Sequence, residues 1–190
     1  MHTPKSAPMR YLLLVTTTWL GIFLLTRFAL LVTHLGEAGH AYLSIFAVGL
    51  LNDLVFLIYA ALPLSLFLLL CPKRLWESRF NRWLLQAVLA LSIYAMLFTA
   101  VAEWLFWDEF GVRFNFIAVD YLVYSDEVLN NVLESYPIGI LLSAIALAAI
   151  VLSLIVRKPF NAAMNAELPT LGGRIATFAG LLLVAGLCLQ

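Results

Sequence analysis

The stretch from Trp104 to Val128 combines carboxylates and aromatic rings in a chain that is otherwise mostly aliphatic. Within it, Asp108 and Glu109 are neighbouring acids of the kind that serve as general acid and base. Adjacent residues of a helix point about 100° apart, however, and no histidine or nucleophile lies beside this pair. We therefore predict no catalytic residue in this stretch.

Binding or docking is one use for these side chains, and a passive belt of aromatic rings at the membrane interface is the alternative. Arg113 is the only basic residue between positions 103 and 137, and a guanidinium at headgroup depth could hold a lipid phosphate through a forked pair of hydrogen bonds. The alternative is a local ion pair with Asp108 or with Glu109, which lies four residues earlier. The other candidates for lipid binding or for docking a further domain are Trp107, Asp108, Glu109, Asn115, Asp120, Tyr124, Asp126 and Glu127.

Metal ligands are suggested elsewhere by His34, Glu37 and His40. The two histidines are six residues apart and glycines lie between them, so the spacing predicts a loop rather than ligands on one helical face. Cys71 and Cys188 fit neither a disulfide framework nor a zinc site. We assign no metal and no cofactor to this chain.

Arg27 and Asp53 each lie inside an apolar segment, where an ionised side chain costs at least ~2.5 kcal/mol unless it is paired or reaches water. At the rise of a helix, Arg27 lies roughly 24 Å from the start of its segment and Asp53 roughly 16 Å from the opposite side, so their heights differ by around 10 Å. An arginine side chain can cover that difference if the helices tilt. We predict an intramembrane ion pair; ligand binding and extension of Arg27 to the headgroups are the alternatives.

The composition explains why these charges are unusual. The chain has 190 residues, of which 64% are hydrophobic and 12% charged, whereas soluble domains have about 45–50% apolar and about 25% charged residues. We therefore predict an all-α integral membrane protein, and the zero net charge gives no indication of nucleic acid. Segments long enough to cross a bilayer, or nearly so, are residues 11–32, 42–70, 83–106, 138–156 and 175–190.

Basic residues set the orientation, because lysine and arginine near span ends stay on the cytoplasmic side. Nine of the eleven lie before the first span or in the loops after the second and fourth, whereas seven acids lie between positions 103 and 134. This predicts a bundle of about five spans: a cytoplasmic terminus (1–10), three spans (11–106), an outer segment (107–137), a fourth span (138–156), a cytoplasmic loop (157–174) and a fifth span (175–190).

The outer segment has its own pattern. From Ile117 to Glu134, apolar residues recur at helical spacing and the acids fall on the opposite face, with Ser125 placed to cap the second half. We predict one or two amphipathic helices along the membrane surface, ending before Pro137. In the fourth span, Gly139, Ser143, Ala144 and Ala148 are small residues that predict close helix packing, and Pro63 predicts a kink in the second.

The sequence FWDEFGVRFNFIAVDYLVYSDEV, followed by ESYP at 134–137, resembles the outer loop of the bacterial lipoteichoic acid synthase family, whose members are also described as membrane-bound sulfatases or phosphoglycerol transferases. The resemblance implies five helices in a bacterial inner membrane, followed by an outward domain of the alkaline phosphatase superfamily. That domain would carry a threonine nucleophile, a divalent metal (Mn, Mg or Zn) and the site for a lipid-linked substrate. None of its catalytic or metal residues can be placed on this chain.

Two functions follow as expectations. In the first, the chain is the membrane anchor of such an enzyme, and the outer segment docks the catalytic domain; the apolar end at Gln190 then indicates a truncated polypeptide. In the second, the chain is a free-standing membrane protein that acts as a partner-binding scaffold or a transporter subunit. An autonomous intramembrane enzyme would need a clustered nucleophile and base, which the sequence does not offer.

Overall fold

A computed structural model describes residues 7–33, 42–111 and 134–188, and every regular element in these ranges is a helix. Four helices are long and apolar enough to cross a membrane: α1 (Ala7–Thr33), α2 (Tyr42–Leu70), α4 (Arg79–Phe110) and α7 (Ile138–Ile155). Helix α9 (Leu171–Leu187) is apolar but shorter. The remaining two, α3 (Lys73–Trp76) and α8 (Arg157–Met164), are short. The prediction of an all-helical fold is confirmed for the described residues, and the four long apolar helices are consistent with a multi-pass membrane protein. A fifth crossing stays a prediction.

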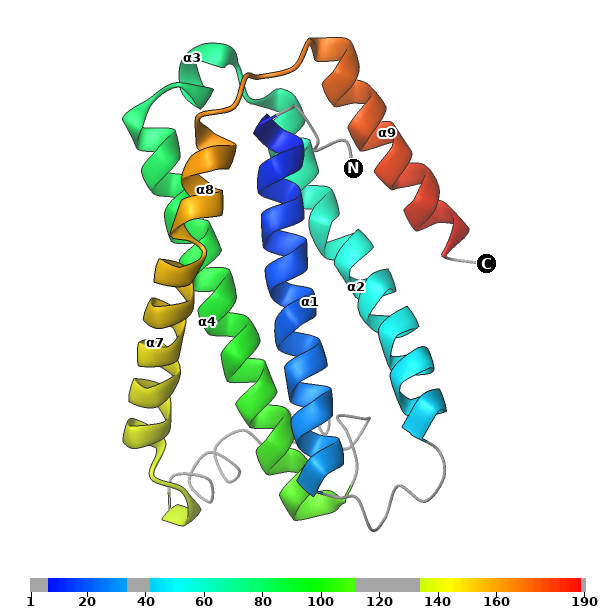
Figure 1. Cartoon of the computed structure of the whole chain (residues 1–190), viewed down its shortest axis with the longest axis vertical. Helices are drawn as coiled ribbons and strands as arrows, with labels where there is room; N and C mark the ends of the chain where they lie inside the picture. Colours follow the sequence, from blue (N-terminus) through cyan, green and yellow to red (C-terminus); the bar gives the residue numbers. More distant parts are fainter. Residues whose placement is uncertain (1–6, 34–41, 112–133, 189–190) are drawn as a thin grey trace.

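The long helices form a row with α1 at its centre (Figure 1). Helix α1 packs against α2 on one side and α4 on the other, α9 packs on the outer side of α2, and α7 packs on the outer side of α4. Successive long helices run in opposite directions. Helix α8 continues from the end of α7 and lies against α1.

Because the helix directions alternate, most of the described basic residues lie at one end of the bundle. We call the end of the bundle where α1, α4 and α9 begin the basic end, and the opposite end, where α2 and α7 begin, the acidic end. Elements at or next to the basic end hold Arg10, Lys73, Arg74, Arg79, Arg82, Arg157, Lys158 and Arg174. The acidic end holds the last turns of α4 with Glu103 and Asp108, and Glu134 just before α7.

Local signals explain where the helices begin and end. The Ser78 hydroxyl accepts a hydrogen bond from the backbone N–H of Asn81 at 3.0 Å, which satisfies one of the free donors at the start of α4. Helix α4 ends at Gly111, whose φ of 64° is the left-handed conformation that glycine adopts at little cost. Helix α9 begins after Thr170, which caps it in the same way as Ser78 caps α4.

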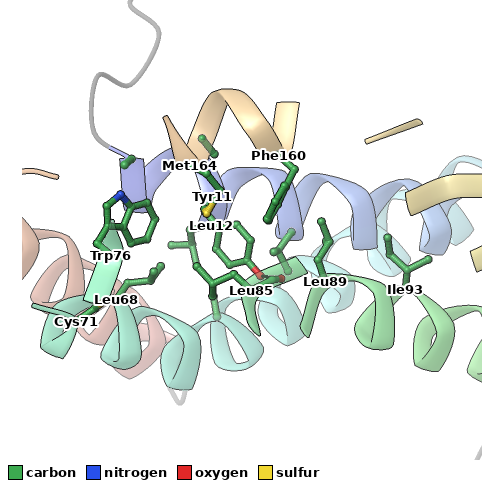
Figure 2. Close-up of a cluster of buried hydrophobic side chains, with 14 of the residues drawn as sticks. Tyr11, Leu12, Leu68, Cys71, Trp76, Leu85, Leu89, Ile93, Phe160 and Met164 are labelled. Carbon is green, nitrogen blue, oxygen red and sulfur yellow. Dashed lines mark hydrogen bonds between the residues drawn. The ribbon is translucent and has the colours of Figure 1, made fainter. Parts of the chain in front are cut away.

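The buried apolar core is concentrated toward the basic end (Figure 2). Tyr11 lies at its centre: its hydroxyl donates to the backbone oxygen of Leu85 at 2.8 Å, and its ring meets Phe160 edge-on at a centroid distance of 6.1 Å. This single side chain therefore connects α1 to both α4 and α8. The residues of the core are Ala7, Tyr11, Leu12, Val15, Ala61, Leu68, Cys71, Trp76, Leu85, Leu89, Ile93, Ala149, Phe160, Ala163 and Met164.

Most other apolar side chains face outward, for example Leu43, Leu91 and Ile140, each more than two thirds exposed. A soluble monomer rarely exposes a continuous apolar surface of this extent, whereas the hydrocarbon of a bilayer covers it at no cost. The surface therefore supports a membrane location independently of helix length.

The structure differs from the sequence-based expectations in its details. Helix α4 extends beyond the predicted 83–106 at both ends, and the loop expected at 157–174 contains α8 and the first turn of α9. The small residues of α7 do not mediate packing within the chain: Gly139, Ser143, Ala144 and Ala148 are exposed. Ile145 and Ala149 are the residues of α7 that are buried. The amphipathic helices expected from Ile117 onward fall mostly on residues 112–133, outside the described ranges.

Candidate functional site: an ion pair buried between two spans

The candidate site lies between α1 and α2, toward the acidic end. Helix α1 carries Arg27 six residues before its end at Thr33, and α2 carries Asp53 eleven residues after its start at Tyr42. Both helices are long and predominantly apolar. Packing of the two helices brings the charges together, as the sequence indicates.

The pairing has two contacts. Nη2 of Arg27 donates to Oδ1 of Asp53 at 2.9 Å, and Nη1 lies 2.9 Å from Oδ2. The Arg27 side chain is only 4% exposed and that of Asp53 12%. One contact is thus a hydrogen bond between charged groups and the other a close ion-pair contact, and the planar fork of a guanidinium lets both oxygens of one carboxylate be approached together.

Gly49 makes room for the guanidinium. It lies one helical turn before Asp53 on the same face of α2, and a Cβ built at position 49 would overlap Cζ, Nε and Nη2 of Arg27. Gly49 is itself buried. The absence of a side chain thus lets the arginine lie flat against the backbone of α2 and reach Asp53.

Three polar atoms in this arrangement are buried without a hydrogen-bond partner among the described residues: Nε and Nη1 of Arg27 and Oδ2 of Asp53, although the last two form the ion-pair contact. The pair is therefore neutral in charge but not saturated in hydrogen bonds, and an unsatisfied buried donor costs about 1–3 kcal/mol. Such a pair is well suited to holding two helices in register.

Among the described residues, no group of three or more histidine, cysteine or acidic side chains could hold a metal ion. His34, Glu37 and His40 lie outside the described ranges. The described geometry of the site is that of a buried salt bridge between two helices.

The other sequence-predicted candidates are placed only in part. Trp107 is half-buried near the end of α4, and the neighbouring Asp108 is exposed. Glu109 belongs to α4, but its side chain is outside the description, so an ion pair with Arg113 stays a prediction. The candidates in the undescribed part are Arg113, Asn115, Asp120, Tyr124, Asp126 and Glu127.

Sequence reasoning missed the residues that attach α9 to α2. Nη1 of Arg174 donates to the backbone oxygens of Leu69 and Cys71, at 3.0 Å and 2.6 Å, and so binds carbonyls left free where α2 ends. Toward the other end of α9, the Tyr59 hydroxyl donates to the oxygen of Ala185 at 2.9 Å, again in the last turn of a helix. Each helix thus binds free carbonyls of the other.

A signal for Arg174 was present in the sequence. It follows Thr170 and two glycines, a pattern typical of a capped helix start, which places the arginine inside α9 rather than in a loop. Gly49 could have been found from its spacing of four residues to Asp53. The partners of Tyr11 and Tyr59 are 74 and 126 residues away, and no local pattern indicates them.

No protein-family model, curated protein or solved structure matches this chain.

Proposed function

We propose that this chain is the membrane anchor of a bacterial envelope enzyme, and that its outer segment docks an outward-facing catalytic domain of the alkaline phosphatase superfamily. The single observation that carries the proposal is the position of the two helix ends that flank the outer segment. Helix α4 ends, and α7 begins, at the acidic end of the bundle, away from nearly all described basic residues. The two helices that flank the segment rich in acids and aromatic rings therefore meet it at the same end of the bundle.

The distribution of charge supports the orientation. Basic residues are retained in the cytoplasm during insertion, so the basic end faces inward and the outer segment faces the envelope. Tryptophan and tyrosine favour the headgroup level, where both their apolar body and their polar edge are satisfied. Trp104, Phe106 and Trp107 in the last turns of α4 fit that level.

The resemblance to lipoteichoic acid synthases supports the chemistry, which would be hydrolysis or transfer of a phosphate or sulfate ester on a lipid-linked substrate. The divalent metal and the nucleophile belong to the outward domain. Within this chain, the role of the helices is to hold the docking surface at a fixed height, and the ion pair of Arg27 with Asp53 keeps α1 and α2 in register beneath it.

The size of the native product gives a first test. An epitope tag inserted at the chromosomal start of the reading frame should reveal a membrane protein much larger than 21.2 kDa. A tagged product near that mass would contradict the anchor proposal and favour the scaffold.

Turnover gives the second test. In the full-length enzyme, Asp120, Asp126 and Glu127 are changed together to the matching amides, and release of the head group from a lipid-linked substrate is measured alongside membrane insertion. We expect normal insertion with reduced turnover, because complementary charge gives docking its specificity. Amide variants of Glu77 and Glu167, exposed acids toward the basic end, are the matched control. Full turnover in the triple variant would indicate that the outer segment is only a passive belt of aromatic rings at the membrane interface.

A transporter subunit or partner-binding scaffold is the second candidate, and the buried ion pair favours it, since ionisable residues inside membranes often mark transport paths. The two functions respond differently to Arg27→Gln combined with Asp53→Asn. An anchor that inserts normally keeps its turnover after this change. A transport site would lose its activity, because both charges are gone.

A further inference from the structure

A small cavity lies where the start of α1, the end of α2 and the start of α9 meet, away from the buried ion pair. Its volume is about 20 Å³, which is room for one water and for no larger ligand. Three polar side chains line it: Ser65 of α2, and Arg174 and Thr177 of α9. The other lining residues are apolar. The polar groups at this cavity therefore decide what occupies it.

The register of the two helices places the two hydroxyl-bearing residues at nearly the same depth. Nη1 of Arg174 donates to the backbone oxygens of Leu69 and Cys71, which fixes the start of α9 against the end of α2. Ser65 lies four residues before Leu69, or roughly 6 Å along α2, and Thr177 lies three residues after Arg174, or roughly 4.5 Å along α9. Because α2 ends and α9 begins at the basic end, both steps lead away from that end.

Hydrogen bonding within the chain leaves one donor and two acceptors at the cavity. Nε of Arg174 is buried and has no hydrogen-bond partner in the described part of the chain. The hydroxyl of Ser65 donates to the backbone oxygen of Leu62 at 2.8 Å, and that of Thr177 donates to the backbone oxygen of Gly173 at 3.0 Å. A hydroxyl has one proton, so each of these oxygens is still free to accept a hydrogen bond but has no second proton to donate.

A water molecule matches this set of groups. Its oxygen accepts from the N–H at Nε of Arg174, and its two protons are donated to the oxygens of Ser65 and Thr177. Buried waters typically make about three hydrogen bonds to polar groups that the protein leaves unsatisfied. A halide ion of similar size would accept from Nε but would face two hydroxyl oxygens whose protons are already used. A metal ion would be repelled by the guanidinium.

We propose that this cavity binds one buried water, which accepts from Nε of Arg174 and donates to Ser65 and Thr177. The water joins α2 to α9 and adds a polar link to the direct bonds made by Arg174 and Tyr59. Water-mediated hydrogen bonds are enthalpically nearly as favourable as direct ones, so the start of α9 is held by the water as well as by the protein. The site is distinct from the outer docking surface, and its test requires no enzyme activity.

The direct test is a crystal structure of the purified chain at a resolution that shows ordered water. We expect one peak of density within about 3.2 Å of Nε of Arg174 and of the hydroxyl oxygens of Ser65 and Thr177. Crystals soaked in sodium bromide distinguish an anion from water, because bromide gives an anomalous signal. A cavity without density, or with an anomalous peak, would overturn the proposal.

Stability in solution gives a second measurement. Thr177→Val nearly keeps the shape of the side chain but removes the acceptor, so it should raise the equilibrium constant of unfolding in sodium dodecyl sulfate by about two- to tenfold, the effect of one hydrogen bond. Thr99→Val in α4 is the matched control. The Thr99 side chain is exposed, and its hydroxyl also donates within its own helix, to Ala95 at 2.9 Å. Equal effects of the two changes would contradict a water held by Thr177.

Coupling between the two helices completes the test. Ser65→Ala should also raise the unfolding constant, although alanine is the better helix former. Ser143→Ala is its control, because the exposed Ser143 hydroxyl donates only within its own helix, to Gly139 at 2.7 Å. Ser65→Ala combined with Thr177→Val should cost less than the product of the two single effects, since both changes act on one shared water. Independent effects, or a stabilising Ser65→Ala, would mean that the two hydroxyls share no water.

Discussion

At the scale of residues, the pair of Arg27 with Asp53 is the contact on which α1 and α2 most depend toward the acidic end. Each charge is stable at that depth only because the other is present, since transferring an unpaired ion into hydrocarbon is costly. Two contacts of 2.9 Å and exposures of 4% and 12% leave little access for water.

A double-mutant cycle tests this dependence. Arg27→Ala and Asp53→Ala should each lower the free energy of unfolding by about 3–5 kcal/mol, because each strands a buried charge. The double variant should lose less than the sum of the two. Unfolding by sodium dodecyl sulfate, followed by circular dichroism, measures the difference.

The exposed pair of Lys73 with Glu77 serves as the control, since its atoms are 3.8 Å apart and both side chains are mostly exposed. Its coupling should be below about 1 kcal/mol. If the Arg27 and Asp53 effects were strictly additive, the two side chains would not be in contact.

Gly49 provides a second test at this scale. Gly49→Ala places a methyl group where the guanidinium lies, so the arginine must move away from Asp53. We expect a loss of about 1–3 kcal/mol, the usual cost of overpacking. Gly139→Ala in α7 is the matched control, because nothing lies within 4 Å of its added carbon. Helix propensity alone favours alanine at both positions by roughly 0.5–1 kcal/mol, so a stabilising Gly49→Ala would contradict the contact.

At the scale of elements, attachment of α9 differs from that of the inner helices. Helix α9 packs chiefly on α2, and Ala185 is its only buried residue. Two polar attachments therefore contribute a large part of what holds it: Arg174 at its start and Tyr59 near its end.

Tyr59→Phe should consequently loosen α9. The hydroxyl donates to a carbonyl that has no partner within its helix, so its loss should cost about 0.5–1.5 kcal/mol. Amide hydrogen exchange should rise in α9 and stay unchanged in α7. Tyr94→Phe is the control, as the Tyr94 hydroxyl makes no hydrogen bond with the part of the chain described here. Equal exchange in both variants would show that the Tyr59 hydrogen bond does not help to hold α9.

Elements could be predicted from the sequence where composition is decisive. A run of twenty apolar residues has one stable form in a bilayer, so α2 appears at its predicted bounds and α7 within one residue of them. Helix ends near the surface were less predictable. There, the residue at which a helix begins or ends depends on single capping residues such as Ser78 and Gly111. Short helices like α8 are buried only through tertiary contacts, which the sequence does not reveal.

The candidate site shows the same division. The need of Arg27 and Asp53 for each other follows from the cost of burying charge, and the sequence alone indicates it. The order of the helices in the row could not be predicted from the sequence. Helix α1 contacts α4 through side chains such as Tyr11 and Trp19, whose partners are more than seventy residues away along the chain. Nothing local to α1 identifies that neighbour.

At the scale of the whole molecule, separation of the basic and acidic ends gives a direct test of orientation. Reporter enzymes fused after Asn115 and after Ala166 should be active on opposite sides of the membrane, the first outside and the second inside, as the asymmetry of basic residues requires. Equal signals from both fusions would contradict the five-span arrangement. Adding lysines at the acidic end, for example Asn115→Lys with Asp120→Lys, should weaken the difference between the two reporters.

The order in which contacts become possible during synthesis follows from the position of the buried pair. Arg27 and Asp53 are separated by 26 residues and lie on consecutive helices, so both are made before α4 exists. The first two helices can therefore leave the translocation machinery as a hairpin whose charges already neutralise each other, and neither has to enter lipid alone. Leu85, the partner of Tyr11, lies 74 residues after it and is made only with α4. Assembly of the bundle thus begins with an electrostatic hairpin and ends with the docking of α9 on a helix synthesised about a hundred residues earlier.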